Sequence, residues 1–141
     1  MLIRWFLFAA VVLVFAGCYS KQDEGDALKV ASRIHAQMQN GDFSGIRKEA
    51  APSFRRAMDE ATFFSSMQAI QKDYGALRKW TPIAYQSGVD TKVGTNHTLH
   101  FDVEFERGRS KERLVFIRSS SGQMELWDIT MEPLPKVNRG G

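Results

Sequence analysis

The first half of the chain has the hydrophobic spacing of helices. Between residues 26 and 39, apolar positions recur every three or four residues, which places them on one face of an amphipathic helix. That face contains Leu28, Ala31, His35 and Met38, with Val30 and Ile34 beside them. Asp26 is the expected N-cap, because its carboxylate accepts hydrogen bonds from the first free backbone amides. Gly41 is the expected stop, since glycine readily takes the left-handed conformation that ends helices.

Two further helices are predicted before the strands. Asp42 is expected to cap a short helix that runs to Ala50, and Pro52 closes or resets it. A longer helix is expected from about Asp59 to Gly75. Its apolar positions have helical spacing and are typical of a core rather than of a cofactor site. They are Phe63, Phe64, Met67, Ile70 and Tyr74.

The second half of the chain changes to strand periodicity. From residue 95 to 106, apolar and polar positions alternate, which indicates a strand with one buried face. The apolar set is His97, Leu99, Phe101, Val103 and Phe105, and the polar set is Thr98, His100, Asp102, Glu104 and Glu106. After a turn that begins at Arg107, residues 113–118 and 124–131 are predicted as strands. Residues 77–86 are a weaker candidate, which Pro82 restricts to a sheet edge because proline donates no ladder hydrogen bond.

This order of elements predicts an α+β fold, with N-terminal helices packed on one face of a curved antiparallel sheet of about four strands. The expected organisation is a leader over residues 1–17, a tether over 18–25, the α+β domain over 26–132 and an irregular tail over 133–141.

The leader has the layout of a secretory signal peptide. Arg4 is its only charge, and residues 5–16 form an apolar block that small residues follow. A permanent membrane-spanning helix needs about 20 apolar residues. This block is shorter, and Lys21, Asp23 and Glu24 come soon after it. A cleaved signal is therefore favoured over an anchor helix.

The end of the block, Val14-Phe15-Ala16-Gly17-Cys18, resembles the bacterial lipobox, although Phe15 replaces the usual leucine. The resemblance implies a diacylglycerol on the Cys18 thiol, cleavage before that residue and fatty acylation, as by palmitate, of the new amino terminus. Cys18 is the only cysteine in the sequence, so an internal disulfide is excluded. Two or three acyl chains hold a soluble domain firmly on a membrane. In a Gram-negative host, Tyr19 at the next position implies the outer membrane, facing the periplasm.

Composition and charge narrow the choice of partners. Hydrophobic residues make up 43% and charged residues 25% of 141 positions, which are globular values. The net charge is +3, but acids are mixed with the basic residues, so nucleic-acid binding is not expected. The densest basic run is interpreted as a solvated hairpin tip. It contains Arg107, Arg109, Lys111 and Arg113, with Glu106 and Glu112 among them.

The domain resembles the NTF2-like (cystatin-like) superfamily. Within that superfamily it resembles the small secreted domains of unknown function. The carriers are a helix ending in Gln39-Asn40-Gly41-Asp42-Phe43, the helical region 54–74 closing on Gly75, and a last strand containing Leu126-Trp127-Asp128-Ile129. The resemblance implies a cone whose curved sheet wraps a helix and often leaves a pocket. Some members are isomerases or dehydratases and others only bind, so the fold does not settle the function.

The sequence shows few candidates for catalysis. In the clearest strand the three acids Asp102, Glu104 and Glu106 lie opposite the apolar face, and Asp128 is expected out of phase with Trp127 and Ile129. No carboxylate pair is therefore expected to point inward. His35 is the one ionisable group on an apolar helical stripe. It is either a general base or a hydrogen-bonded core histidine, of which the second is commoner.

No metal or cofactor is predicted. His97 and His100 are three apart on a strand, so they face opposite sides and cannot share a metal ion. The sequence also lacks a glycine-rich phosphate loop and a nucleophile motif.

Two functions remain open. The first is a non-enzymatic envelope module that binds a small apolar ligand or an envelope protein, and a homodimer is also open. The second is an NTF2-like lyase or isomerase that acts on a small apolar molecule through His35. Burial of His35 beside an open cavity would favour the enzyme, and a packed cone with an exposed apolar patch would favour the module.

Overall fold

The computed structural model describes residues 15–132, with side chains from residue 21 onward. In this range four helices precede four strands. The helices are α1 (Phe15–Gln39), α2 (Phe43–Glu49), α3 (Pro52–Ala57) and α4 (Glu60–Tyr74), and the strands are β1 (Leu77–Asp90), β2 (Gly94–Phe105), β3 (Gly108–Arg118) and β4 (Met124–Met131). The greater part of the predicted leader, residues 1–14, and the tail over 133–141 lie outside the described residues.

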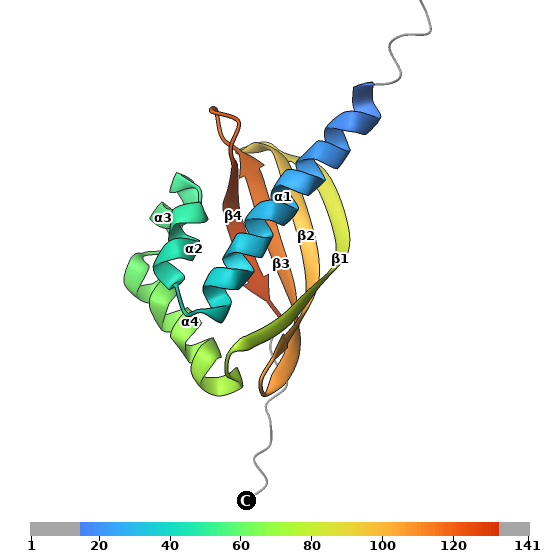
Figure 1. Cartoon of the computed structure of the whole chain (residues 1–141). Coiled ribbons are helices and arrows are strands. Elements are labelled where there is room, and N and C mark those ends of the chain that lie inside the picture. Colours follow the sequence, from blue (N-terminus) through green and yellow to red (C-terminus); the bar gives the residue numbers. More distant parts are fainter. Residues whose placement is uncertain (1–14, 133–141) are drawn as a thin grey trace, which may run out of the picture.

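The strands form one antiparallel sheet in the order β1-β2-β3-β4. The sheet curves, and α1 lies across its inner face, while α2, α3 and α4 gather beyond β4 (Figure 1). β1 is an edge strand, as Pro82 predicted, and the pairing with β2 shifts between Pro82 and Ala84. The expected α+β architecture is confirmed.

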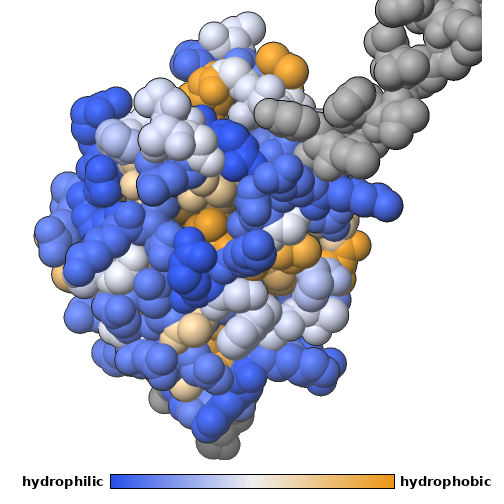
Figure 2. All heavy atoms as spheres, turned by 45° about the horizontal axis from the view of Figure 1, so that its top comes forward, coloured by the Kyte–Doolittle hydropathy of each residue, from blue (hydrophilic) through white to orange (hydrophobic). Residues whose placement is uncertain are grey.

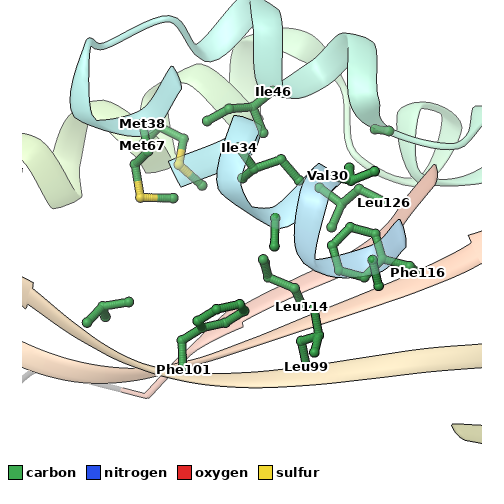
Figure 3. Packing of buried hydrophobic residues seen from close by; sticks show 14 of the residues in the cluster. Val30, Ile34, Met38, Ile46, Met67, Leu99, Phe101, Leu114, Phe116 and Leu126 are labelled. Atoms are coloured by element: carbon green, nitrogen blue, oxygen red, sulfur yellow. The ribbon is translucent and has the colours of Figure 1, made fainter. Parts of the chain in front are cut away.

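The core lies between α1 and the inner face of the sheet. Alternate residues of β2 and β3, such as Leu99 and Leu114, face each other in the register and point toward α1. Figure 3 shows Ile34 and Met38 of α1 above them, with Met67 of α4 beside Met38. All of these side chains are less than 8% exposed. The helical stripe predicted for residues 26–39 is therefore the packing face of α1.

The predicted start of the first helix at Asp26 is wrong. α1 begins at Phe15 and continues through the segment 18–25 that was expected to be a tether. Asp26 does not cap a helix, because it lies inside α1. Its carboxylate and that of Asp23 both accept hydrogen bonds from Arg118 of β3. Asp23 is only 8% exposed. The ion pairs of Asp23 and Asp26 with Arg118 hold this part of α1 against the end of β3.

α2 ends at Glu49 and Pro52 begins a separate short helix, α3, which agrees with the prediction that Pro52 closes or resets the second helix. The proline holds a first-turn position of α3. Proline suits that position, where its backbone has no amide to leave unpaired. β3 begins at Gly108 rather than near residue 113, so the β2–β3 hairpin has a two-residue connection.

Replacing Gly75 with alanine should destabilise the domain. Gly75 ends α4 at φ 79° and ψ −165°, a conformation that essentially only glycine adopts. A Cβ there would also lie 2.6 Å from Oε2 of Glu106. We expect a loss of about 1–3 kcal/mol in the free energy of unfolding, measured with urea. The control is Gly25→Ala in α1, where a Cβ meets nothing within 4 Å. It should be neutral or stabilising by up to about 1 kcal/mol, and equal losses in both variants would contradict this account of Gly75.

Candidate functional site

The structure brings together His35 of α1 and Glu112 of β3, which are 77 residues apart in the sequence. Nε2 of His35 lies 2.5 Å from Oε1 of Glu112. Both side chains have no exposed surface. A carboxylate that holds one ring nitrogen of a histidine is an arrangement that general acid–base catalysis uses. It is also a common way to satisfy a buried histidine.

Aromatic side chains close around the imidazole of His35. The ring of Trp80 stacks on it with centroids 5.0 Å apart, and the ring of Phe101 meets it edge-on at 4.7 Å. Nδ1 of His35 and Oε2 of Glu112 have no hydrogen-bond partner among the described residues. Glu112 also borders a hollow of about 230 Å³ beside His100 on the outer face, but its side chain is unexposed there. A substrate therefore reaches the pair only if packed side chains move.

The position of Glu112 corrects the sequence analysis. The basic run around it was interpreted as a solvated hairpin tip, yet Glu112 is 1% exposed. It occupies the same face as Leu114 and Phe116, because alternate residues of a strand share a face. The expectation that His35 lies on the apolar stripe and finds a hydrogen-bond partner is met. The three acids Asp102, Glu104 and Glu106 are exposed or half-buried, as predicted.

His97 and His100 lie on opposite sides of the sheet, as the spacing predicted. His97 is 3% exposed on the inner side, and its Nδ1 lies 3.0 Å from the Tyr85 hydroxyl. Burial lowers the pKa of the His97 imidazole below its ordinary value of 6.5, while the nearby Asp23 carboxylate opposes that shift. Burial likewise raises the pKa of the Tyr85 phenol above 10.0. The Tyr85 hydroxyl and Nδ1 of His97 thus share one hydrogen bond on the inner side of the sheet.

The depressed pKa of His97 predicts an acid-sensitive fold. Below about pH 6.5 the unfolded chain binds a proton at this residue that the folded chain binds only at lower pH. The contribution of neutral His97 to the stability of the fold is therefore complete above about pH 6.5. It is lost as the pH falls through the pKa that His97 has in the folded chain. The urea midpoint should fall less on acidification in His97→Gln than in the wild type. His100→Gln on the outer face is the control and should respond to pH like the wild type. If the urea midpoint of His97→Gln fell as much on acidification as that of the wild type, His97 would not be the source of the acid sensitivity.

The outer side of the molecule carries a groove between α3 and the sheet. Its volume is about 510 Å³. Trp127 of β4 and Met58, which follows α3, are half-buried there, and Val115 of β3 forms part of the floor. Arg113 and Asp128 also line it and form an ion pair at 2.9 Å. The groove thus combines an accessible indole with one charged pair.

The face of Trp127 was not predicted correctly. Strict alternation placed Trp127 opposite Asp128, but both residues line the outer groove. The cause is a register shift between Val115 and Phe116 in the pairing of β3 with β4, which gives β4 one extra residue. Ile129 packs against the inner core, as expected.

The described residues contain no group of three or more histidine, cysteine, aspartate or glutamate side chains placed to bind a metal ion. Within residues 15–132, none of the helices combines the length and apolar character that crossing a bilayer requires. Cys18, the predicted lipid-attachment residue, lies in the first turn of α1, five positions before Asp23.

Comparisons with known proteins identify the fold. No protein-family model and no curated protein matches the sequence. Solved structures do match. One is a protein from Shewanella frigidimarina NCIMB 400, provisionally assigned as a ketosteroid isomerase, with 18% identity and a TM-score of 0.51 over 76% of this chain and 94% of that one. Another, from Catenulispora acidiphila, has 11% identity and a TM-score of 0.58 over 82% of this chain and 94% of that one.

The chain has the NTF2-like fold. Helices followed by a curved, open, four-stranded antiparallel sheet are its defining arrangement, and the matched structures share it. At this level of identity the likeness establishes the fold of the NTF2-like domain and not its activity.

Proposed function

We propose that this protein is a membrane-anchored envelope lipoprotein whose NTF2-like domain is a non-enzymatic binding module for a small apolar ligand or an envelope protein. The anchor is a lipid on Cys18. Support for it comes from the sequence, where a short apolar block ends in small residues directly before the only cysteine.

The observation that carries the binding role is the contrast between the two sides of the sheet. On the inner side, His35 and Glu112 have no exposed surface and are packed among large apolar side chains. On the outer side, a groove of about 510 Å³ exposes part of Trp127. Tryptophan and arginine are the residues that most often dominate binding energy, and Arg113 lies in the same groove. The accessible chemistry therefore suits contact with a partner.

The test is native mass spectrometry of the full-length protein, extracted from its own membranes in mild detergent. We expect a bound molecule or partner protein of defined mass. The variant Trp127→Ala should weaken that binding about 30-fold or more, because loss of a central tryptophan costs about 2 kcal/mol or more. Lys72→Ala, a change at an exposed residue that does not line the groove, is the control. Binding that is equal in all three proteins would refute the groove as the site.

A second function is an NTF2-like lyase or isomerase, and one observation favours it. The contact of 2.5 Å between His35 and Glu112 would let the carboxylate orient the imidazole as a general base. A structural neighbour is provisionally assigned as a ketosteroid isomerase. This function requires an open form in which Trp80 or Phe101 leaves the imidazole. We rank it second because the pair is sealed on the inner side.

A further inference from the structure

The first part of α1 is fixed to one end of the sheet. The Asp23 carboxylate accepts a hydrogen bond from Nη2 of Arg118, and Oδ2 of Asp26 lies 3.0 Å from the same nitrogen. The second terminal nitrogen of the guanidinium, Nη1, donates to the carbonyl oxygen of Gly122 in the β3–β4 turn at 2.7 Å. Arg118 is thus held by three oxygens. It ties α1 to the turn that follows β3.

This attachment leaves little chain between the domain and the predicted lipid. Cys18 precedes Asp23 by five positions, and both lie in α1. A helix rises 1.5 Å per residue, so their backbones are only about 7.5 Å apart along the axis. The irregular tether that the sequence suggested would span up to ~17 Å over the same five positions and would turn freely. The helical link restricts both the distance and the direction.

Two turns lie at the end of the sheet from which α1 projects, as Figure 1 shows. One is the β1–β2 turn over residues 91–93, and the other is the β3–β4 turn over residues 119–123. The β2–β3 turn and the C-terminal end of α4 lie at the opposite end, where Arg107 binds the carbonyl oxygens of Lys72 and Asp73. The end of the domain with the β1–β2 and β3–β4 turns, close to Cys18, is called the near end. The opposite end, with the β2–β3 turn, is called the far end.

The near end exposes groups that suit a lipid headgroup layer. Val89, close to the β1–β2 turn, is 84% exposed, the highest value among the exposed large apolar side chains of the described residues. Lys92 in the turn and Lys21 in the second turn of α1 are exposed. Figure 2, in which this end is brought forward, shows a mostly hydrophilic surface with small hydrophobic patches. An exposed apolar side chain and lysines at the same end of the domain match the boundary between headgroups and acyl chains.

We propose that the bilayer surface is the partner of this end, so that α1 seats the β1–β2 and β3–β4 turns against the headgroups in one orientation. The far end, with the β2–β3 turn, then points away from the membrane. The inference rests on the lipid attachment to Cys18 proposed above. It adds a fixed orientation, which a lipid on a flexible tether does not impose.

The test is fluorescence quenching on full-length, acylated protein in phosphatidylcholine vesicles that carry a quencher on the headgroup. A thiol-reactive dye is placed at Thr91→Cys or Ser121→Cys in the near turns, or at Lys72→Cys at the far end. These side chains are exposed, and Cys18 does not react because its sulfur carries the lipid. We expect several-fold stronger quenching at the two near positions than at Lys72→Cys. A Gly/Ser insertion after Ser20, as long as segment 18–25, should remove that difference.

Each result separates the inference from the proposed function. Equal quenching at both ends of a protein that floats with the vesicles would overturn the fixed orientation and leave the anchor intact. A near-end preference that survives the Gly/Ser insertion would also overturn it, since α1 would not be its cause. A protein that acquires no lipid and does not float would overturn both.

Discussion

Replacing Glu112 with leucine is expected to destabilise the domain by about 3–5 kcal/mol, because the change leaves the His35 imidazole buried without its partner. His35→Leu should cost a similar amount, since it strands the Glu112 carboxylate. The free energy of unfolding, measured in urea by tryptophan fluorescence, gives the size of each loss. These are the largest stability effects that we expect from single polar substitutions in this domain.

The double variant decides what the pair contributes. His35→Leu combined with Glu112→Met removes both polar groups and keeps a similar volume, so most of the lost stability should return. Asp102→Ala on the exposed face is the control and should change stability by less than about 0.5 kcal/mol. A double variant less stable than either single variant would contradict a mutually satisfied pair. A stable double variant that still binds the molecule found by native mass spectrometry would count against catalysis as the main function.

Changing Cys18 to serine is expected to abolish metabolic labelling of the protein with a palmitate analogue. Serine has no thiol for the diacylglycerol, and the resemblance to the lipobox implies that cleavage depends on the same residue. Labelling is a better readout than fractionation, because an uncleaved leader with its apolar block still associates with membranes. Unchanged labelling of Cys18→Ser would remove the basis for the anchor.

The same labelling experiment can also test whether lipid attachment requires the cysteine at residue 18 rather than at a nearby position. In a variant with Cys18→Ser and Ser20→Cys, the single thiol lies three positions after Gly17, the last small residue of the motif. We expect no labelling, because the lipobox resemblance places the modified cysteine directly after Gly17. Ser20→Ala alone should be labelled like the wild type. Labelling of the shifted cysteine would mean that the modification does not follow the motif.

Most of the fold could be predicted from periodicity. The helical face of residues 26–39 and the alternation through β2 placed Ile34, Leu99 and Phe101 in the core, where the structure has them. Pro82 identified β1 as an edge strand. These features are local, since the spacing of apolar residues indicates which face a regular helix or strand buries. The early start of α1 was missed because the polar composition of residues 19–25 suggests a tether, and the contact of Asp23 with Arg118 joins residues far apart in the sequence.

The polar pair was predicted only in part. His35 was visible as an ionisable group on an apolar stripe, but Glu112 was not recognised because basic residues flank it. The sequence did indicate the buried position of Glu112. Alternate residues of a strand share a face, so Glu112 lies on the same face as the buried Leu114, two residues later. The contact between the two residues joins α1 to β3 and cannot be read from either local pattern. The outer position of Trp127 depends on a register shift, which the spacing of residues in β4 does not reveal.

The most direct test of the central claim is the intact mass of the full-length gene product after extraction from membranes. A lipid-anchored module predicts a chain that begins at Cys18 and carries the added mass of a diacylglycerol, with or without a further acyl group. A chain that keeps its leader, or that is cut elsewhere and carries no lipid, would contradict it. The same sample, kept under native conditions, would also report what the domain holds.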